Sequence, residues 1–306
     1  MTLNAIPEKQ NQPKFIRLLR ARSETYRCAV HWQIVQLIFT VLVPVGCAIT
    51  GLLFTQTRPY VAMIAIAVTL LDIAILDRAV KRQLKIAALI CEEFDCQLLD
   101  IPWDSFTAGK CLQPETIIKA DRHWSSGDSK LVNWYPKVVA WAPMYLARIV
   151  CQRTNLWYDA TLREKYGSFL LSGALLITIM FVVAGLVVNL SVDDFVVTIF
   201  APCAPLLSWA LRDFFKQRDA ADAQKMARSE AESLWELAIT GGCCQDECAR
   251  RSREFQNTIF QRRVSNPLIF PLIYNWLRAG MEVDMNLGAE DLLRKAGITI
   301  VASPPS

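Results

Sequence analysis

Four long apolar runs limit how this chain can fold more than any other feature. They cover 34–54, 59–76, 167–190 and 195–211, and Asp72 is the single charged residue within them. About 20 apolar residues in a helix span the roughly 30 Å hydrocarbon core of a bilayer. Because the runs are paired by short connections, they predict two helical hairpins that each cross the membrane and return.

Composition supports this interpretation. Hydrophobic residues make up 53% of the 306-residue chain, above the about 45–50% of soluble domains. The excess lies in the four runs, while the charged residues lie between them. We therefore expect an all-α dominated integral membrane protein, with four transmembrane helices in two hairpins and a mostly helical cytosolic domain. Pro202 and Pro205 predict a kink in the fourth helix.

The distribution of lysine and arginine predicts the orientation. Six lie in residues 1–32, thirteen in 77–166 and thirteen in 212–306, whereas the two short hairpin connections contain only Arg58. Positive side chains concentrate on the cytoplasmic side of membrane proteins. Both termini and the central segment are accordingly expected in the cytoplasm.

This pattern divides the chain into five segments. They are a basic cytosolic N-terminal segment (1–33), a first transmembrane hairpin (34–76), a central cytosolic segment (77–166), a second transmembrane hairpin (167–211) and a cytosolic C-terminal helical segment (212–306).

Amphipathic spacing predicts helices outside the membrane over 77–99, 216–239 and 246–264. Residues 101–135, which contain several prolines, glycines and aromatic residues, are expected to be irregular. The acidic residues Glu92, Glu93 and Asp95 fall on a predicted helix, where their usual position is a solvated face.

Polar residues within the apolar runs are the candidates for a pore or a gate. Gln36, Thr40, Cys47 and Thr50 form a stripe on one face of the first predicted span, typical either of a pore lining or of packing between membrane helices. Asn189 is a weaker candidate of the same kind in the third span.

Asp72 lies near the cytoplasmic end of the second span. A carboxylate in a span suggests a functional site, but a structural ion pair with Arg78 or Lys81 is the alternative. A packed four-helix bundle has a filled core, so conduction implies a homo-oligomer.

Candidate ligand contacts lie in two cytosolic stretches. Aromatic and basic side chains can stack on bases and pair with phosphates, although packing is the commoner role of such aromatic residues. For the second stretch a structural ion-pair cluster is the alternative. The candidates are Arg122, Trp124, Trp134 and Tyr135 in the first stretch, and Arg153, Trp157 and Arg163 in the second.

The sequence offers no catalytic constellation. We find no nucleophile and base pair, no glycine-rich phosphate loop and no carboxylate cluster of catalytic type, so an enzyme is not expected. Ten scattered cysteines indicate reduced intracellular thiols rather than a disulfide framework. Cys243, Cys244 and Cys248 lack nearby histidine partners, and no metal site or resident cofactor is predicted.

Six strings of sequence carry a family resemblance. They are IPEKQN (6–11), LLRARSETYRCA (18–29), EEFDCQLLDIPWDSF (92–106), LVNWYP (131–136), IVCQRTNLWYDATLREKY (149–166) and NPLIFPLIYNWLRAGMEVDMN (266–286). Together with the two hairpins, they resemble the four-transmembrane pore-forming effectors associated with SMODS-type nucleotidyltransferases. Pro271 departs from the expected pattern, because it interrupts the C-terminal apolar run.

The resemblance implies a role in CBASS anti-phage defence at the bacterial inner membrane. A partner nucleotidyltransferase would make a cyclic oligonucleotide on infection, and the effector would bind it and breach the lipid bilayer. DNA and RNA polymers are not implied as partners. A small channel or transporter and a membrane-anchored scaffold are the alternatives that the residues themselves leave open.

Overall fold

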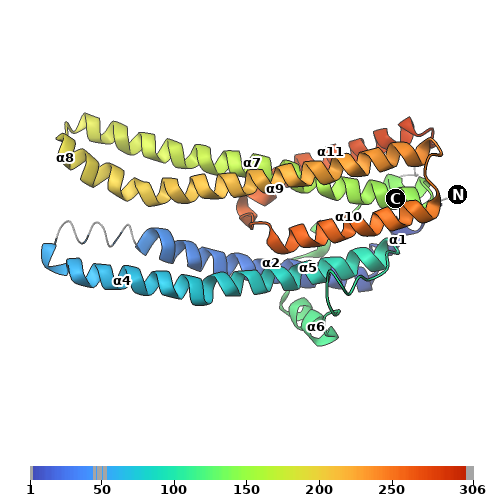
Figure 1. The fold of residues 1–306 in the computed structure, drawn as a ribbon, viewed down its shortest axis with the longest axis horizontal. Helices are drawn as coiled ribbons and strands as arrows, with labels where there is room; N and C mark the ends of the chain where they lie inside the picture. The colour runs from blue at the N-terminus through green and yellow to red at the C-terminus, as the bar shows by residue number, and fades with distance from the viewer. Residues whose placement is uncertain (1–2, 44–45, 47–49, 51–53, 301–306) are drawn as a thin grey trace.

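The computed structural model describes residues 3–43, 46, 50 and 54–300, and every regular element within them is helical. Two long antiparallel hairpins dominate the fold (Figure 1). Part of the first apolar run, including Cys47, lies outside the described residues.

The first hairpin pairs two arms of different make-up. Its outgoing arm is α2 (Pro13–Leu37) followed by the π-helical turn η1 (Ile38–Leu42), and it turns near the 3-10 turn η2 (Thr55–Thr57). The returning arm is α4 (Arg58–Leu71), the π-helical turn η3 (Asp72–Leu76) and α5 (Asp77–Leu98).

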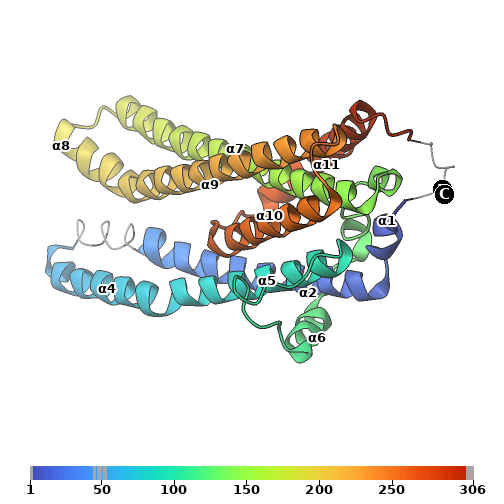
Figure 2. The same cartoon turned by 45° about the vertical axis from the view of Figure 1, so that its right-hand side comes forward.

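The second hairpin is built from the two longest helices. They are α7 (Met144–Val187) and α9 (Ala201–Ile239), and they pack side by side along their length. The short helix α8 (Val192–Phe195) and the π-helical turn η6 (Val196–Phe200) complete the turn. A 45° rotation shows the same pairing (Figure 2).

Shorter elements pack at the other end of the hairpins. They are α1 (Ile6–Lys9), α6 (Pro114–His123), the 3-10 turns η4 (Asp128–Lys130) and η5 (Lys137–Trp141), α10 (Gln245–Ser265) and α11 (Pro271–Lys295). The helices predicted over 77–99, 216–239 and 246–264 are confirmed by α5, α9 and α10. The expected irregular stretch 101–135 contains one helix, α6.

The main hydrophobic core gathers residues from almost the whole length of the chain. Phe15 from α2, Phe94 from α5, Leu156 from α7 and Trp235 from α9 are all buried in it, together with Leu293 near the end of α11. Most of the elements that supply it lie at the end of the hairpins away from α4 and α8 (Figure 1). We call this part of the molecule the body.

The hairpin ends have the opposite character, because large apolar side chains face outward there. Large apolar side chains exposed in such number mark an interaction with lipid or protein. Examples are Tyr60 (66% exposed), Met63 (68%), Leu176 (60%), Leu186 (63%) and Val187 (74%). We call this surface the apolar ends.

Within the described residues, one helix, α7, is long and apolar enough to cross a bilayer. Of the other apolar runs, 59–76 is divided by η3 and 195–211 by η6, and 34–54 is divided by η1 and extends outside the described residues. Pro205 lies inside α9, just beyond η6.

Candidate functional site

A network of buried charges joins α5 to α10 inside the body. Glu92 and Asp95 are 0% and 1% exposed, so the predicted solvated face is wrong for these two residues. Arg253 of α10 lies 2.5 Å from Glu92, and Arg263 lies 2.6 Å from Asp95. Each buried carboxylate thus has its own guanidinium, as burial requires.

Neutral side chains complete the hydrogen bonding of this network. The amide of Gln256 donates to Glu92 at 2.9 Å and to Asp95 at 3.0 Å, and the Tyr135 hydroxyl donates to Asp95 at 2.7 Å. Gln152 of α7 donates to the Gln256 oxygen at 3.2 Å. The network therefore links α5, α7, α10 and the segment before η5. We call it the carboxylate network.

Electrostatics keep Tyr135 neutral and Arg263 charged. Burial raises the pKa of Tyr135, and the adjacent Asp95 carboxylate raises it further. Burial by itself lowers the pKa of Arg263, but the attraction of Asp95, together with smaller contributions from neighbouring thiol and phenol groups, outweighs this effect and raises the pKa overall. Arg263 therefore stays a cation despite its burial.

A second polar cluster lies where the body meets the apolar ends. Arg163 of α7 is 7% exposed. It donates to Asp159 at 2.8 Å, to Gln217 of α9 at 2.7 Å and to the carbonyl of Pro267 at 2.8 Å. Gln224 of α9 donates to Asp159 at 2.7 Å. We call this group the Arg163 cluster.

The Arg163 cluster joins three segments at one level. It connects α7, α9 and the extended link between α10 and α11, since Gln217 also donates to the Leu268 carbonyl at 3.1 Å. Immediately beyond it, a Cβ at Gly167 would lie 3.4 Å from that of Gln217. The helices α7 and α9 are thus in van der Waals contact at this level.

Gln36 and Asp72 meet in the first hairpin. The Gln36 amide donates to the Asp72 carboxylate at 2.7 Å, and the Thr40 hydroxyl donates to the Gln36 carbonyl at 2.8 Å. Lys81 pairs instead with Asp77 at 2.7 Å, so the alternative of a Lys81 ion pair with Asp72 is not what the structure has. Asp72 is the first residue of the π-helical turn η3, and η1 begins two residues after Gln36. Such π-helical turns recur at functional sites.

Asn189 lies in the turn after α7. Its φ is 56°. Its backbone N–H donates to the Leu186 carbonyl at 3.1 Å, and the backbone N–H of Leu190 donates to the Gly185 carbonyl at 3.2 Å. These bonds form a Schellman motif, in which glycine or asparagine is preferred at the left-handed position. The structure thus gives Asn189 a local role as a helix cap.

The predicted ligand contacts fall in several different places. Arg122 is exposed at the end of α6 and Trp124 is half-buried beside it, while Trp134 stacks on Arg22 with the guanidinium 4.6 Å from the ring centre. Tyr135 lies in the carboxylate network. Arg163 is fully engaged in its own cluster.

Arg153 and Trp157 lie one turn apart on α7. Arg153 pairs with Glu232 of α9 at 2.8 Å, and Trp157 is half-buried. The structure therefore does not bring the seven predicted residues into one site. The functional role of each remains a prediction.

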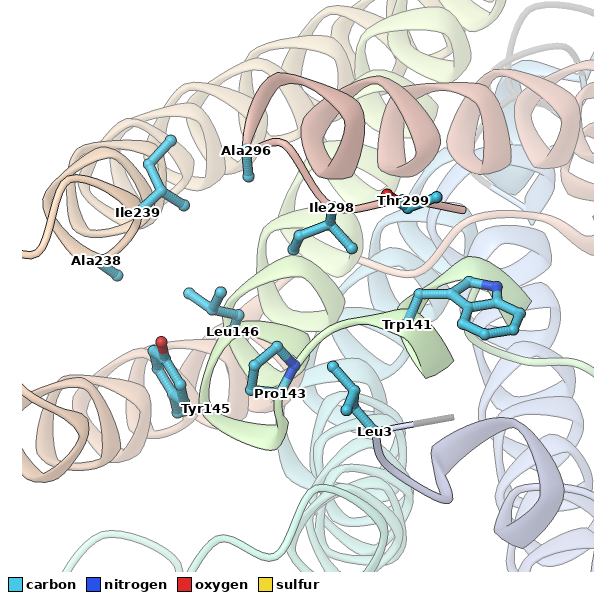
Figure 3. A pocket seen from close by; sticks show the side chains of 10 residues that line it. All are labelled: Leu3, Trp141, Pro143, Tyr145, Leu146, Ala238, Ile239, Ala296, Ile298 and Thr299. Atoms are coloured by element: carbon cyan, nitrogen blue, oxygen red, sulfur yellow. The ribbon is translucent and has the colours of Figure 1, made fainter. Parts of the chain in front are cut away.

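Two cavities open on the body. The larger, about 550 Å³, lies between the N-terminal segment and the ends of α9 and α11 (Figure 3). Its lining contains no charged side chain: Leu3, Trp141, Pro143, Tyr145, Leu146, Ala238, Ile239, Ala296, Ile298 and Thr299.

The smaller cavity, about 300 Å³, is polar. Trp124 lines it together with Arg20, Asp121 and Asp128. Arg20 pairs with both acids there. Among the described residues, no group of three or more histidine, cysteine or acidic side chains could hold a metal ion.

A body with buried charges, carried on helices that continue into exposed apolar ends, defines a membrane-associated helical protein. A family model for the SMODS-associating 4TM effector domain matches residues 4–292. The chain belongs to this family, as the resemblance predicted, and the family places it in CBASS anti-phage defence.

One relative is a protein of Bacillus cereus (strain VD146) described as a probable CBASS effector molecule. It is 24% identical over 287 residues, which are 89% of this chain and 92% of the relative. No solved structure matches.

Proposed function

We propose that this protein is a ligand-gated effector that permeabilises the bacterial inner membrane during anti-phage defence. A cyclic oligonucleotide made by a partner nucleotidyltransferase binds the body, and the apolar ends then rearrange or assemble. The effector acts by binding and catalyses no reaction.

One observation carries this proposal. The helices α7 and α9 run without interruption from the body into the apolar ends, and the Arg163 cluster joins them where these two parts meet. A ligand that changes the packing of the body therefore acts on the same helices that carry the exposed apolar surface. The family membership supports the same proposal.

The proposed topology has four spans. Runs 34–54 and 59–76 form the first transmembrane hairpin, and runs 167–190 and 195–211 form the second. The positive-inside rule then places both termini in the cytoplasm. Conduction requires several copies, because a packed four-helix bundle has a filled core.

The ligand would bind through the more accessible candidates. Arg122 is exposed, and Trp124, Trp134, Arg153 and Trp157 are half-buried. Tyr135 and Arg163 are saturated by internal partners and would respond to the ligand indirectly. The cyclic oligonucleotide must bind the permeable form more tightly than the resting form if it is to shift the population.

Dye entry into cells tests this function. We expect propidium uptake and loss of membrane potential when the protein is expressed with an active cyclic-oligonucleotide synthase, and neither with a catalytically dead synthase. An intact barrier with verified ligand and verified membrane insertion would overturn the proposal.

The Asp72 and Gln36 pair allows the same experiment to be carried out with a point variant. In the variant Asp72→Asn the side chain keeps its shape and loses its charge, and a hydrogen bond to a charged group contributes about 1.5–3 kcal/mol. We expect synthase-dependent dye entry to slow by about tenfold or more, with unchanged amounts of protein in the membrane. The control is Thr69→Ser, a conservative change three residues away, which should leave dye entry unchanged.

A further inference from the structure

Three cysteines lie together at the turn between α9 and α10. Helix α9 ends at Ile239, Gly241 takes a left-handed φ of 76°, and Cys244 caps the start of α10. Cys243 precedes this cap, and Cys248 lies in the first turn of the helix. The tight turn thus brings thiols five residues apart onto one side of the α10 N-terminus.

The sulfurs of Cys243 and Cys248 lie 3.2 Å apart. A disulfide bond is about 2.05 Å long, so the two atoms need to approach by only about 1.2 Å. No element has to move, because both residues belong to the same turn. The neighbouring Cys244 is exposed and has no comparable sulfur contact among those described.

The two thiols differ in their access to solvent. Cys248 is 0% exposed and belongs to the main core, whereas Cys243 is half-buried at its edge. Burial, followed by the hydrogen bond to Cys243, raises the pKa of Cys248 to about 12, so this thiol stays protonated at neutral pH. Since Cys243 is the more accessible of the two thiols, it is the residue that reacts first.

We propose that Cys243 and Cys248 form a redox-modification site whose oxidant is a peroxide. The Cys243 thiolate attacks the peroxide oxygen, which breaks the O–O bond, releases water after protonation and leaves a sulfenic acid. The Cys248 sulfur then displaces the sulfenic oxygen, and its proton leaves with that oxygen as a second water. Two thiols and one hydrogen peroxide thus become one disulfide and two waters.

The disulfide would act on the body through α10. This helix supplies Arg253, Gln256 and Arg263 to the carboxylate network. A covalent link between Cys243 and Cys248 fixes the segment that enters α10 against the first turn of that helix. Oxidation would therefore hold the start of α10 in its described arrangement. This inference does not depend on the proposed membrane function.

The test uses the purified full-length protein in detergent. The protein is treated with stoichiometric hydrogen peroxide, the remaining thiols are alkylated with N-ethylmaleimide, and intact mass and peptide masses are recorded. We expect a loss of two hydrogens, two fewer alkylated thiols and a cross-linked peptide pair joining Cys243 to Cys248. Cys244 should remain alkylated.

Variants make the outcome specific. Cys243→Ser, at a half-buried position, should abolish the cross-link, whereas the matched control Cys244→Ser should retain it. In Cys248→Ser the sulfenic acid on Cys243 has no resolving thiol and should be trapped by dimedone. A cross-link through Cys244, or full alkylation of Cys243 and Cys248 after peroxide treatment of folded protein, would overturn the proposal.

Discussion

The buried carboxylates Glu92 and Asp95 show how the body accommodates charge without water. Each is neutralised by an arginine from α10 and shares the Gln256 amide with the other. A buried ion pair adds little net stability compared with well-packed apolar residues, but the loss of one partner leaves an uncompensated charge. The carboxylate network therefore favours one arrangement of α5 and α10.

Removal of Arg253 should be costly for this reason. The variant Arg253→Met leaves Glu92 buried without its cation, and we expect destabilisation of about 3–5 kcal/mol. Thermal unfolding in detergent micelles measures the change. The control Arg250→Met breaks exposed pairs of the same helix with Glu247 and Glu254, which solvent screens and which therefore contribute little to stability. An equal loss of stability in Arg253→Met and Arg250→Met would contradict the role given to the carboxylate network.

Asp159 makes the stability of the Arg163 cluster depend on pH. Burial raises the pKa of Asp159, but Arg163 and Gln224 outweigh it, so the pKa lies below its usual value of 3.8. A lowered carboxyl pKa stabilises the fold above the unfolded-state pKa, and this contribution is lost as the pH falls through the folded value.

The variant Asp159→Asn should therefore be less stable at neutral pH and lose less stability between pH 5 and pH 3. The pH dependence of its unfolding free energy should correspond to the uptake of about one proton fewer. Thermal unfolding across this range measures the difference. Asp222→Asn, which changes an exposed acid on α9, should keep the acid dependence of the unmodified protein. An unchanged acid dependence in Asp159→Asn would show that Asp159 makes no such contribution.

Part of this residue-level detail could be predicted from the sequence. The spacing of Glu92 and Asp95 puts them on one helical face, but a solvated face and a buried one give the same spacing. The distinguishing signal lies in α10, where Arg253, Gln256 and Arg263 share a face with the buried Ile259 and Phe260. Their partners are about 160 residues away, and no local pattern shows that pairing.

At the scale of elements, the helices were well predicted and their irregularities were not. Hydrophobic period and charge indicated α5, α9 and α10. Pro271, which was expected to interrupt the C-terminal apolar run, instead begins α11, where proline is favoured in the first turn. The π-helical turns η1, η3 and η6 have no such signal. A π-helical turn contains about one residue more than an α-helical turn. Whether it forms depends on packing against neighbouring helices rather than on local composition.

The turn after α7 allows a test of the Asn189 cap against a pore-lining role. Asn189→Gly suits the left-handed position and should preserve stability and dye entry. Asn189→Ala should cost about 1 kcal/mol in thermal unfolding, because alanine lacks the short polar side chain that lets asparagine adopt the left-handed conformation. Loss of synthase-dependent dye entry in a fully stable Asn189→Gly would instead support a direct role of the amide.

At the scale of the whole molecule, the five predicted segments do not correspond to five separate units. Helix α7 runs through the predicted boundary at 166, and α9 runs through the one at 211. The body combines residues of the N-terminal, central and C-terminal segments in one core. Contacts between segments that are distant in the sequence cannot be recognised in a hydropathy pattern. The segment boundaries therefore remain predictions of where the chain enters and leaves the membrane, and they do not predict how the segments pack.

The proposed topology predicts which thiols a membrane-impermeant maleimide can reach. Val192 is 79% exposed beside the α8 turn, and Val192→Cys should be labelled in intact spheroplasts. The exposed native residues Cys28, Cys111 and Cys244 should be labelled only after lysis. Peptide mapping separates the four sites, and labelling of Cys111 in sealed spheroplasts would contradict a cytoplasmic body.

The unbroken length of α7 has a mechanical consequence. At 1.5 Å per residue, its 44 residues form a rod of about 66 Å. If such a rod pivots by about 5° at its body end, its far end travels about 6 Å, close to one helical pitch. A rearrangement of a few side chains around a small ligand can thus become a displacement the size of a helix turn on the opposite side of a bilayer, without bending any element.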